Sequence, residues 1–178
     1  RVIATGSSSF ELADQIGEPL TGRKRVLSLF PISQGELLLL HNRFELKQGL
    51  EERLIFGAYP QVIIARTRRA RIEVISEIAN SYLLKDILDF DRVRGSRAIW
   101  DLLKLLAFQV GSEVSQNELS RSLGIDVKMV GRYLDLLEKA FVLYRLDGFS
   151  RNLRSEVTRN SKYYFYDNGI RNAVVNQF

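Results

Sequence analysis

The feature that most constrains the fold is a pair of short helical patterns joined by a glycine. Ser115-x-x-Glu118 has the spacing of a capping box, which predicts a helix over residues 116–123. Gly124 follows as a tight turn, and Asp126 can cap a second helix. The second helix carries an apolar seam at spacings of three and four residues, formed by Val127, Val130, Leu134, Leu137 and Phe141. Two short helices arranged in this way are typical of a helix-turn-helix.

The residues on both sides of these helices predict a winged helix-turn-helix. Before them, Ser96 can cap a helix whose apolar face is Ile99, Leu102, Leu103, Leu106 and Val110. After them, apolar and aromatic runs at 142–146 and 163–166 predict two strands, and the stretch between the strands would form the wing. Alternation puts Tyr163 and Phe165 on one side of the second strand and Tyr164 and Tyr166 on the other. This favours a strand packed into the core over a surface that stacks nucleic-acid bases.

Basic side chains near the predicted helices and wing are the candidates for contact with DNA. Lys128 and Arg132 lie on the predicted exposed side of the second helix, which Asp135 and Glu138 share. The predicted wing carries four more cations, Arg151, Arg154, Arg159 and Lys162, against one acid. Cations in this arrangement suit phosphate contacts, which give weak, salt-dependent binding without sequence preference. The sequence leaves two roles open, DNA contact and protein packing with a solvated basic loop.

The first 44 residues alternate between strand and helix patterns. Apolar runs at 2–5 and 25–29 predict strands. Capping boxes that begin at Ser8 and Ser33 predict helices over about 10–16 and through Leu40. This alternation is typical of an α/β domain, here without most of its parallel sheet. Because Arg1 leads directly into the first predicted strand, we interpret the chain as an internal piece of a longer protein.

From residue 45 to about residue 90 the pattern is helical. Leu46, Leu50 and Leu54 predict one apolar stripe, residues 57–60 interrupt the pattern, and a long helix is predicted over 66–90. The start of that helix is basic, with Arg66, Arg68, Arg69 and Arg71. Two interpretations of these arginines stay open, a solvated helix start and a site for an anion or a partner.

The composition excludes several classes of site. The chain has no cysteine, and His41 is the only histidine, so we expect neither disulfides nor a metal site nor a Ser-His-Asp triad. The longest apolar stretch, 102–110, is far shorter than the ~20 residues of a membrane span, and no signal peptide is recognisable. We therefore expect a cytoplasmic protein without membrane contact. The formal net charge of +5 is spread along the chain, which permits an anionic partner without requiring one.

Six short runs occur in an order that resembles a known family. They are residues 4–9, 20–23, 30–33 with 36–37, 57–60, 82–87 and 164–172. Together they cover nearly the whole chain, which resembles the prokaryotic AAA-type ATPases that carry a C-terminal domain of unknown function with a restriction-endonuclease-like fold. Gly17-x-x-x-x-Gly22-Arg23-Lys24 is not the phosphate loop of such an ATPase, because that motif needs Lys in the place of Arg23 and Ser or Thr after it.

The resemblance implies a mostly α fold in four segments. Residues 1–44 would be the C-terminal remnant of an α/β AAA core, 45–95 a helical linker or lid, 96–162 the winged helix-turn-helix, and 163–178 the start of the nuclease-like domain. The phosphate loop and Walker B acids would precede Arg1. This chain alone would therefore be inactive and hold no cofactor, whereas the longer parent protein would bind ATP and Mg²⁺.

The resemblance also implies candidate residues for sensing the nucleotide. Ser7 and Ser8 match the segment in which a polar residue senses the γ-phosphate, and Arg23 would contact phosphate or structure the following turn. Two functions stay open. The chain is a fragment of an AAA-type ATP-binding protein that couples nucleotide state to a winged helix, or it is a winged-helix DNA-binding regulator without enzymatic activity. A truncated core would also expose sheet surface, so self-association of the piece is expected.

Overall fold

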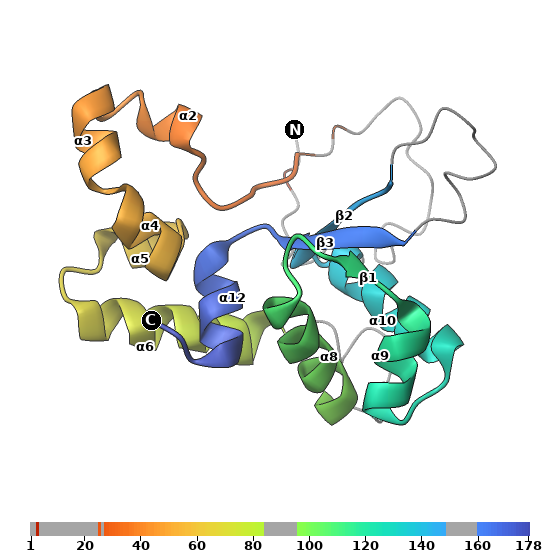
Figure 1. The fold of residues 1–178 in the computed structure, drawn as a ribbon. Coiled ribbons are helices and arrows are strands. Elements are labelled where there is room, and N and C mark those ends of the chain that lie inside the picture. The colour runs from red at the N-terminus through yellow and green to blue at the C-terminus, as the bar shows by residue number, and fades with distance from the viewer. Residues whose placement is uncertain (1–2, 4–24, 26, 84–95, 149–159) are drawn as a thin grey trace.

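A computed structural model describes residues 3, 25, 27–83, 96–148 and 160–178 of the chain. Within these ranges the protein is mostly helical and has one small sheet (Figure 1). The first half holds α2 (Gln34–Leu37), α3 (Arg43–Gln48), α4 (Leu50–Phe56), α5 (Pro60–Ile64), α6 (Arg68–Glu77) and the π-helix η1 (Ile78–Leu83). The second half holds α8 (Ser96–Phe108), β1 (Glu113–Val114), α9 (Gln116–Leu123), α10 (Val127–Lys139), β2 (Leu143–Leu146), β3 (Ser161–Phe165) and α12 (Asn168–Val175).

The sheet is antiparallel, and its last strand is the central one. The strand order is β1-β3-β2, with Glu113 opposite Lys162 and Tyr144 opposite Tyr164. On β3, Tyr163 and Phe165 are buried, whereas the ring of Tyr164 stacks on that of Tyr144 on the other face, with centroids 5.3 Å apart. The predicted two-sided strand is confirmed. The predicted segment boundary between residues 162 and 163 falls inside β3.

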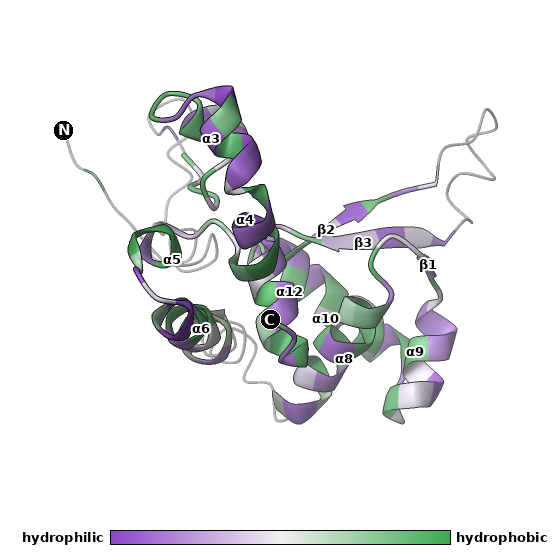
Figure 2. Cartoon of the chain, turned by 60° about the vertical axis from the view of Figure 1, so that its left-hand side comes forward, coloured by the Kyte–Doolittle hydropathy of each residue, from purple (hydrophilic) through white to green (hydrophobic). Residues whose placement is uncertain are grey.

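One hydrophobic core joins the helices to the sheet. The predicted inner face of α8 is confirmed for Ile99, Leu102, Leu103 and Leu106, all at most 1% exposed. Val110 lies beyond the end of α8 and is 41% exposed, so it does not belong to that face. The seam of α10 is buried at Val130, Leu134 and Leu137. Figure 2 shows α8, α10 and α12 gathered together with their hydrophobic segments, and α12 also contacts α4 and α6.

The N-terminal predictions are confirmed only in part. The predicted strand over 25–29 is wrong for residues 27–29, which form no strand and leave Leu27 and Leu29 exposed. A strand requires a hydrogen-bonded neighbour, and the described part of the chain places none beside these residues. The capping box at Ser33 is confirmed, but α2 ends at Leu37 and gives way to a turn before it reaches Leu40. Apart from Ile3, the first strand and helix lie outside the described residues.

Two helical predictions between residues 45 and 90 need correction. Leu46, Leu50 and Leu54 do not form one stripe, because Gly49 ends α3 and begins α4; Leu46 is buried, whereas the other two are exposed. The long helix begins at Arg68, because the Thr67 hydroxyl accepts a hydrogen bond from the Ala70 N–H at 3.1 Å. It then widens into the π-helix η1, and residues 84–95 lie outside the described ranges. None of the described helices is long and apolar enough to cross a membrane.

Candidate functional site

The helices α9 and α10, called the helix pair below, are fixed by side chains at their ends. The Ser115 hydroxyl accepts from the Glu118 N–H, and the Asp126 carboxylate accepts from the Lys128 N–H at 2.7 Å. Gly124 adopts the left-handed conformation that the turn requires, with φ 66° and ψ 30°. Both predicted helices and both N-cap residues are therefore confirmed, and of the predicted capping box the structure shows the bond to Ser115.

The turn has a further lock that sequence reasoning missed. The Ser120 hydroxyl donates to the Ile125 carbonyl at 2.6 Å, and the Ile125 N–H donates to the Ser120 carbonyl at 3.2 Å. A serine inside a helix does not by itself indicate a hydrogen-bond partner. The partner of this hydroxyl becomes visible only once the structure places Ile125 after the turn. These two hydrogen bonds join α9 to the residue that follows the turn.

The exposed face of α10 carries the two predicted cations. Lys128 and Arg132 are exposed and one helical turn apart, so they lie on the same side of α10. Asp135, one turn further on, pairs with Lys139 at 2.7 Å and adds a negative charge to that side. The first residue of α9 lies close to this face, because a Cβ added at Gly131 would be 3.4 Å from the Gln116 Oε1.

Gln116 was not among the predicted contact residues. A polar residue after a cap carries no signal of its own in the sequence. In the structure its exposed side chain lies near Gly131, between the positions of Lys128 and Arg132 on α10. The resulting surface combines two cations with an amide, and these groups suit hydrogen bonds to phosphate oxygens.

The strands hold the base of the connection between β2 and β3. The Asp147 carboxylate accepts from the Ser161 hydroxyl at 2.7 Å and pairs with the Arg145 guanidinium at 2.9 Å. These contacts tie the two ends of the connection together. The predicted contact residues Arg151, Arg154 and Arg159 lie outside the described residues, as do the nucleotide-sensing candidates Ser7, Ser8 and Arg23.

A second cluster of specific contacts joins the α4–α5 turn to the start of α12, and we call it the junction. The Asp167 side chain is buried, with one oxygen accepting from the Ala58 N–H at 2.7 Å and the other from the Ile170 N–H at 3.2 Å. The Ala58 carbonyl accepts from the Ile32 N–H at 2.9 Å. Three of the six sequence runs, 30–33, 57–60 and 164–172, therefore meet at Ala58.

Close backbone packing completes this junction. A Cβ on Gly169 would overlap the Phe56 carbonyl, so the start of α12 lies directly against the end of α4. The Asn172 amide donates to the carbonyls of Leu54 and Ile55, at 3.2 and 2.7 Å, which α4 leaves without helical partners. The contacts join elements more than a hundred residues apart in sequence.

Burial sets the protonation behaviour of the junction. It raises the pKa of Asp167, and the N–H groups of Ala58, Ile170 and Gly169 oppose that rise. Burial, together with the negative charge of Asp167, raises the pKa of Tyr59 to about 12. Because backbone donors engage both carboxylate oxygens, Asp167 acts here as a structural acceptor that holds two elements together.

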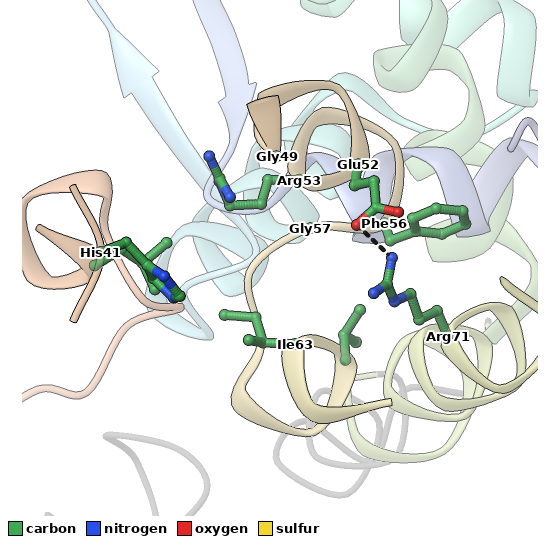
Figure 3. Close-up of a pocket in the computed structure, with 10 residues that line it drawn as sticks. His41, Gly49, Glu52, Arg53, Phe56, Gly57, Ile63 and Arg71 are labelled. Carbon is green, nitrogen blue, oxygen red and sulfur yellow. Dashed lines mark ion pairs between the residues drawn. The ribbon is translucent and has the colours of Figure 1, made fainter. Parts of the chain in front are cut away.

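A small pocket lies between α2, α4, α5 and α6 (Figure 3). Arg71 closes one side through an ion pair with Glu52 at 2.7 Å, and its Nε also donates to the Ala65 carbonyl. The cavity measures about 80 Å³, well below the ~300–1,000 Å³ of typical ligand sites. It has room for a few water molecules. The Nε of Arg53, one of the residues that line it, is buried and has no hydrogen-bond partner among the described residues. We assign no nucleotide site to it.

The basic cluster at the start of α6 is largely engaged with the protein itself. Arg69 pairs with Glu73 at 2.8 Å, and the guanidinium groups of Arg68 and Arg71 lie over the ring of Phe56, 5.3 and 5.7 Å from its centroid. These contacts favour a structural role for the cluster. Within the described ranges, no three His, Asp or Glu side chains gather to hold a metal ion.

Comparison with known proteins gives relatives without a described activity. A protein of Haemophilus influenzae is 26% identical over 98% of this chain and 46% of its own length. A protein of Methanocaldococcus jannaschii is 23% identical over 93% of this chain and 41% of its own length. Both are named as uncharacterized. The chain thus spans less than half the length of either relative.

No solved structure matches the chain. A family model does match, and it covers residues 47–178, from the end of α3 to the last residue. It therefore includes the helix pair, the sheet and both sides of the contact between α4 and α12. Since this match covers more than half of the sequence, the chain belongs to the family described as Domain of unknown function (DUF8612).

Proposed function

We propose that this chain is the winged-helix part of a longer, cytoplasmic AAA-type ATPase and that α10 contacts DNA phosphates. The observation that carries the proposal is the order of the elements. α8, β1, α9, α10, β2 and β3 follow one another, and β3 lies between β1 and β2. This is the order and pairing expected of a winged helix, with α10 in the place of the recognition helix and the β2–β3 connection in the place of the wing.

The exposed side of α10 supports contact with phosphates rather than reading of bases. Lys128 and Arg132 are one turn apart on α10, and Gln116 lies near Gly131 of the same helix, whereas Asp126 and Asp135 reduce the local positive charge. Two cations among acids give a weak electrostatic attraction. The predicted wing arginines Arg151, Arg154 and Arg159 would add phosphate contacts to this face. We therefore propose weak binding that falls steeply with salt.

The ATPase part of the proposal draws on the sequence resemblance and on length. Both relatives are more than twice as long as the stretch they share with this chain, which leaves room for a nucleotide-binding core. In the parent protein that core would bind ATP and Mg²⁺, and Ser7, Ser8 and Arg23 would face the phosphates. The alternative function is a winged-helix DNA-binding regulator without enzymatic activity, and the same element order supports it.

DNA contact is tested by fluorescence anisotropy of a labelled duplex over a series of salt concentrations. We expect Lys128→Ala and Arg132→Ala each to weaken binding to all sequences alike and to lower the salt slope by about 1. Arg69→Ala is the matched control, because it removes the same charge from an exposed side chain on α6, which lies far from α10 in Figure 1. Binding that resists high salt, or equal losses in all three variants, would refute phosphate contact through α10.

The ATPase part needs the full-length parent protein. ATP hydrolysis by that protein should fall when Ser7→Ala or Ser8→Ala is introduced, since either hydroxyl would orient the attacking water. A parent protein that neither binds nor hydrolyses ATP would leave the regulator as the remaining function. DNA binding is measured separately, so the two parts of the proposal succeed or fail independently.

Self-association of the isolated chain is also proposed, because several large apolar side chains are exposed around α2 and α3. Leu39, Leu40 and Phe44 are 85%, 79% and 70% exposed, which is unusual for adjacent large apolar side chains. Light scattering should show oligomers of the wild-type chain and fewer of Leu39→Glu. A chain that stays monomeric at high concentration would contradict this.

A further inference from the structure

The segment before α2 makes contacts that neither the helix pair nor the pocket explains. We call residues 27–33 the strap. Within the strap, the ring of Phe30 stacks on that of Tyr166, with centroids 5.1 Å apart and planes 13° apart. Leu29, its neighbour, is 97% exposed, whereas Phe30 is 46% exposed. Of these two neighbouring side chains, Phe30 is therefore the one that packs against the sheet.

Phe30 reaches the end of the proposed recognition helix. Its ring meets that of Phe141 edge to face, with centroids 5.2 Å apart. Phe141 directly follows Ala140, the C-cap of α10, and has a φ of 55°. A bulky residue rarely adopts this left-handed conformation, which persists only where its surroundings hold it in place. Two backbone hydrogen bonds of a Schellman motif, from Phe141 to Glu138 and from Val142 to Leu137, favour this conformation locally. Phe30 adds a ring contact to the same residue.

The strap has a second attachment, and it leads to the same place. The Ile32 N–H donates to the Ala58 carbonyl at 2.9 Å, and the Ala58 N–H donates to Asp167 at 2.7 Å. Asp167 follows Tyr166, on which Phe30 stacks. Ring stacking and hydrogen bonding thus fasten the strap to the point where β3 passes into α12, and the ring of Phe30 adds the point where α10 passes into β2.

We propose that the strap is a regulatory link: when it is docked, it holds the end of α10 and the sheet in the arrangement that binds DNA. Movement of the residues before it would pull Phe30 from its site and weaken binding. The physical reason is preorganisation, because undocking of the strap removes the ring contacts that support the C-cap of α10 at Phe141 and lets α10 shift against β2 and β3. This inference rests on the proposed function, in which the preceding residues belong to the ATPase core.

The test compares Phe30→Ala with Leu29→Ala in the complete chain. Phe30→Ala removes both ring contacts, whereas Leu29→Ala removes a neighbouring side chain that is almost fully exposed. Phe30→Tyr keeps the ring and should behave as the wild type. The first measurement is amide hydrogen exchange at Val142 and Tyr166, whose N–H groups bond to Leu137 and Val142. We expect severalfold faster exchange only in Phe30→Ala.

The second measurement is the affinity for the labelled duplex. We expect Phe30→Ala to bind at least about fivefold more weakly than Leu29→Ala. Unchanged exchange in Phe30→Ala would show that the strap does not support the end of α10, whatever the DNA result. Faster exchange with unchanged affinity would overturn the regulatory link. Faster exchange in a chain whose wild type does not bind DNA would instead overturn the proposed function and retain the strap as a mechanical contact.

Discussion

Removal of the Asp167 carboxylate should destabilise the protein by more than the loss of a helix cap. Asp167→Ala takes away the acceptor for the Ile170 N–H, which caps α12, and the acceptor for the Ala58 N–H, which comes from the α4–α5 turn. A lost cap costs about 1 kcal/mol. The Ala58 N–H is partly buried and would lose its partner, which costs about 1 kcal/mol at the low end of the range for such groups.

These two losses give a decrease of about 2 kcal/mol in the free energy of unfolding. One effect opposes them. Burial raises the pKa of Asp167, so the charged carboxylate is itself unfavourable in the folded protein, and its removal returns part of the loss. The value of about 2 kcal/mol is therefore an upper value at neutral pH.

The assay is denaturant unfolding, with Asp126→Ala as the control. Asp126 also caps a helix, but it is exposed and accepts only from within its own helix, so its loss should cost about 1 kcal/mol. Asp167→Ala should in addition speed hydrogen exchange at Ala58, far away in sequence. Equal losses in the two variants, with unchanged exchange at Ala58, would refute the role of Asp167 as a link between α4–α5 and α12.

Two further predictions concern the same junction. Gly169→Ala should lower the free energy of unfolding by about 3 kcal/mol in chemical denaturation, because its Cβ would meet backbone atoms of Phe56. Gly35→Ala is the control: its Cβ would lie 3.8 Å from the nearest atom, so it should be neutral or slightly stabilising. The pKa of Asp167 is raised in the folded state. The stability that this shift gives the folded protein is therefore fully present below the ordinary pKa of 3.8, and it is lost as pH rises through the folded pKa. Wild type should therefore gain stability relative to Asp167→Asn when pH falls from neutral to mildly acidic; a relative loss would mean that the hydrogen bonds outweigh burial.

Local signals in the sequence were sufficient for the helix pair. Ser115, Gly124 and Asp126 interact with residues close to them in sequence, so the local sequence is enough to predict where the helices begin and end. The faces of α8 and α10 follow from helical periodicity for the same reason. For the candidate site, this placed Lys128 and Arg132 correctly on an exposed face, whereas Gln116 required the contact across Gly131.

Errors arose where one residue changes the direction of the chain. Gly49 divides a run of leucines that has helical spacing, so Leu50 and Leu54 turn toward solvent although their pattern matches Leu46. Residues 27–29 have the composition of a strand, but composition does not supply the partner that a strand requires. In both cases the local pattern was present, but the backbone turn at Gly49 and the lack of a described partner strand at 27–29 outweighed it.

The junction at Ala58 could not be predicted, because its partners are distant in sequence and each is unremarkable alone. The run at 57–60 resembles an ordinary turn, and the run at 167–169 an ordinary cap. Besides α4, which it meets near this junction, α12 also packs on α6 and α8. The helix pair and the first helices are thus parts of one packed unit, joined through α12. The proposed link from the strap to α10 through Phe30 would therefore act within one packed unit, without a hinge between two domains.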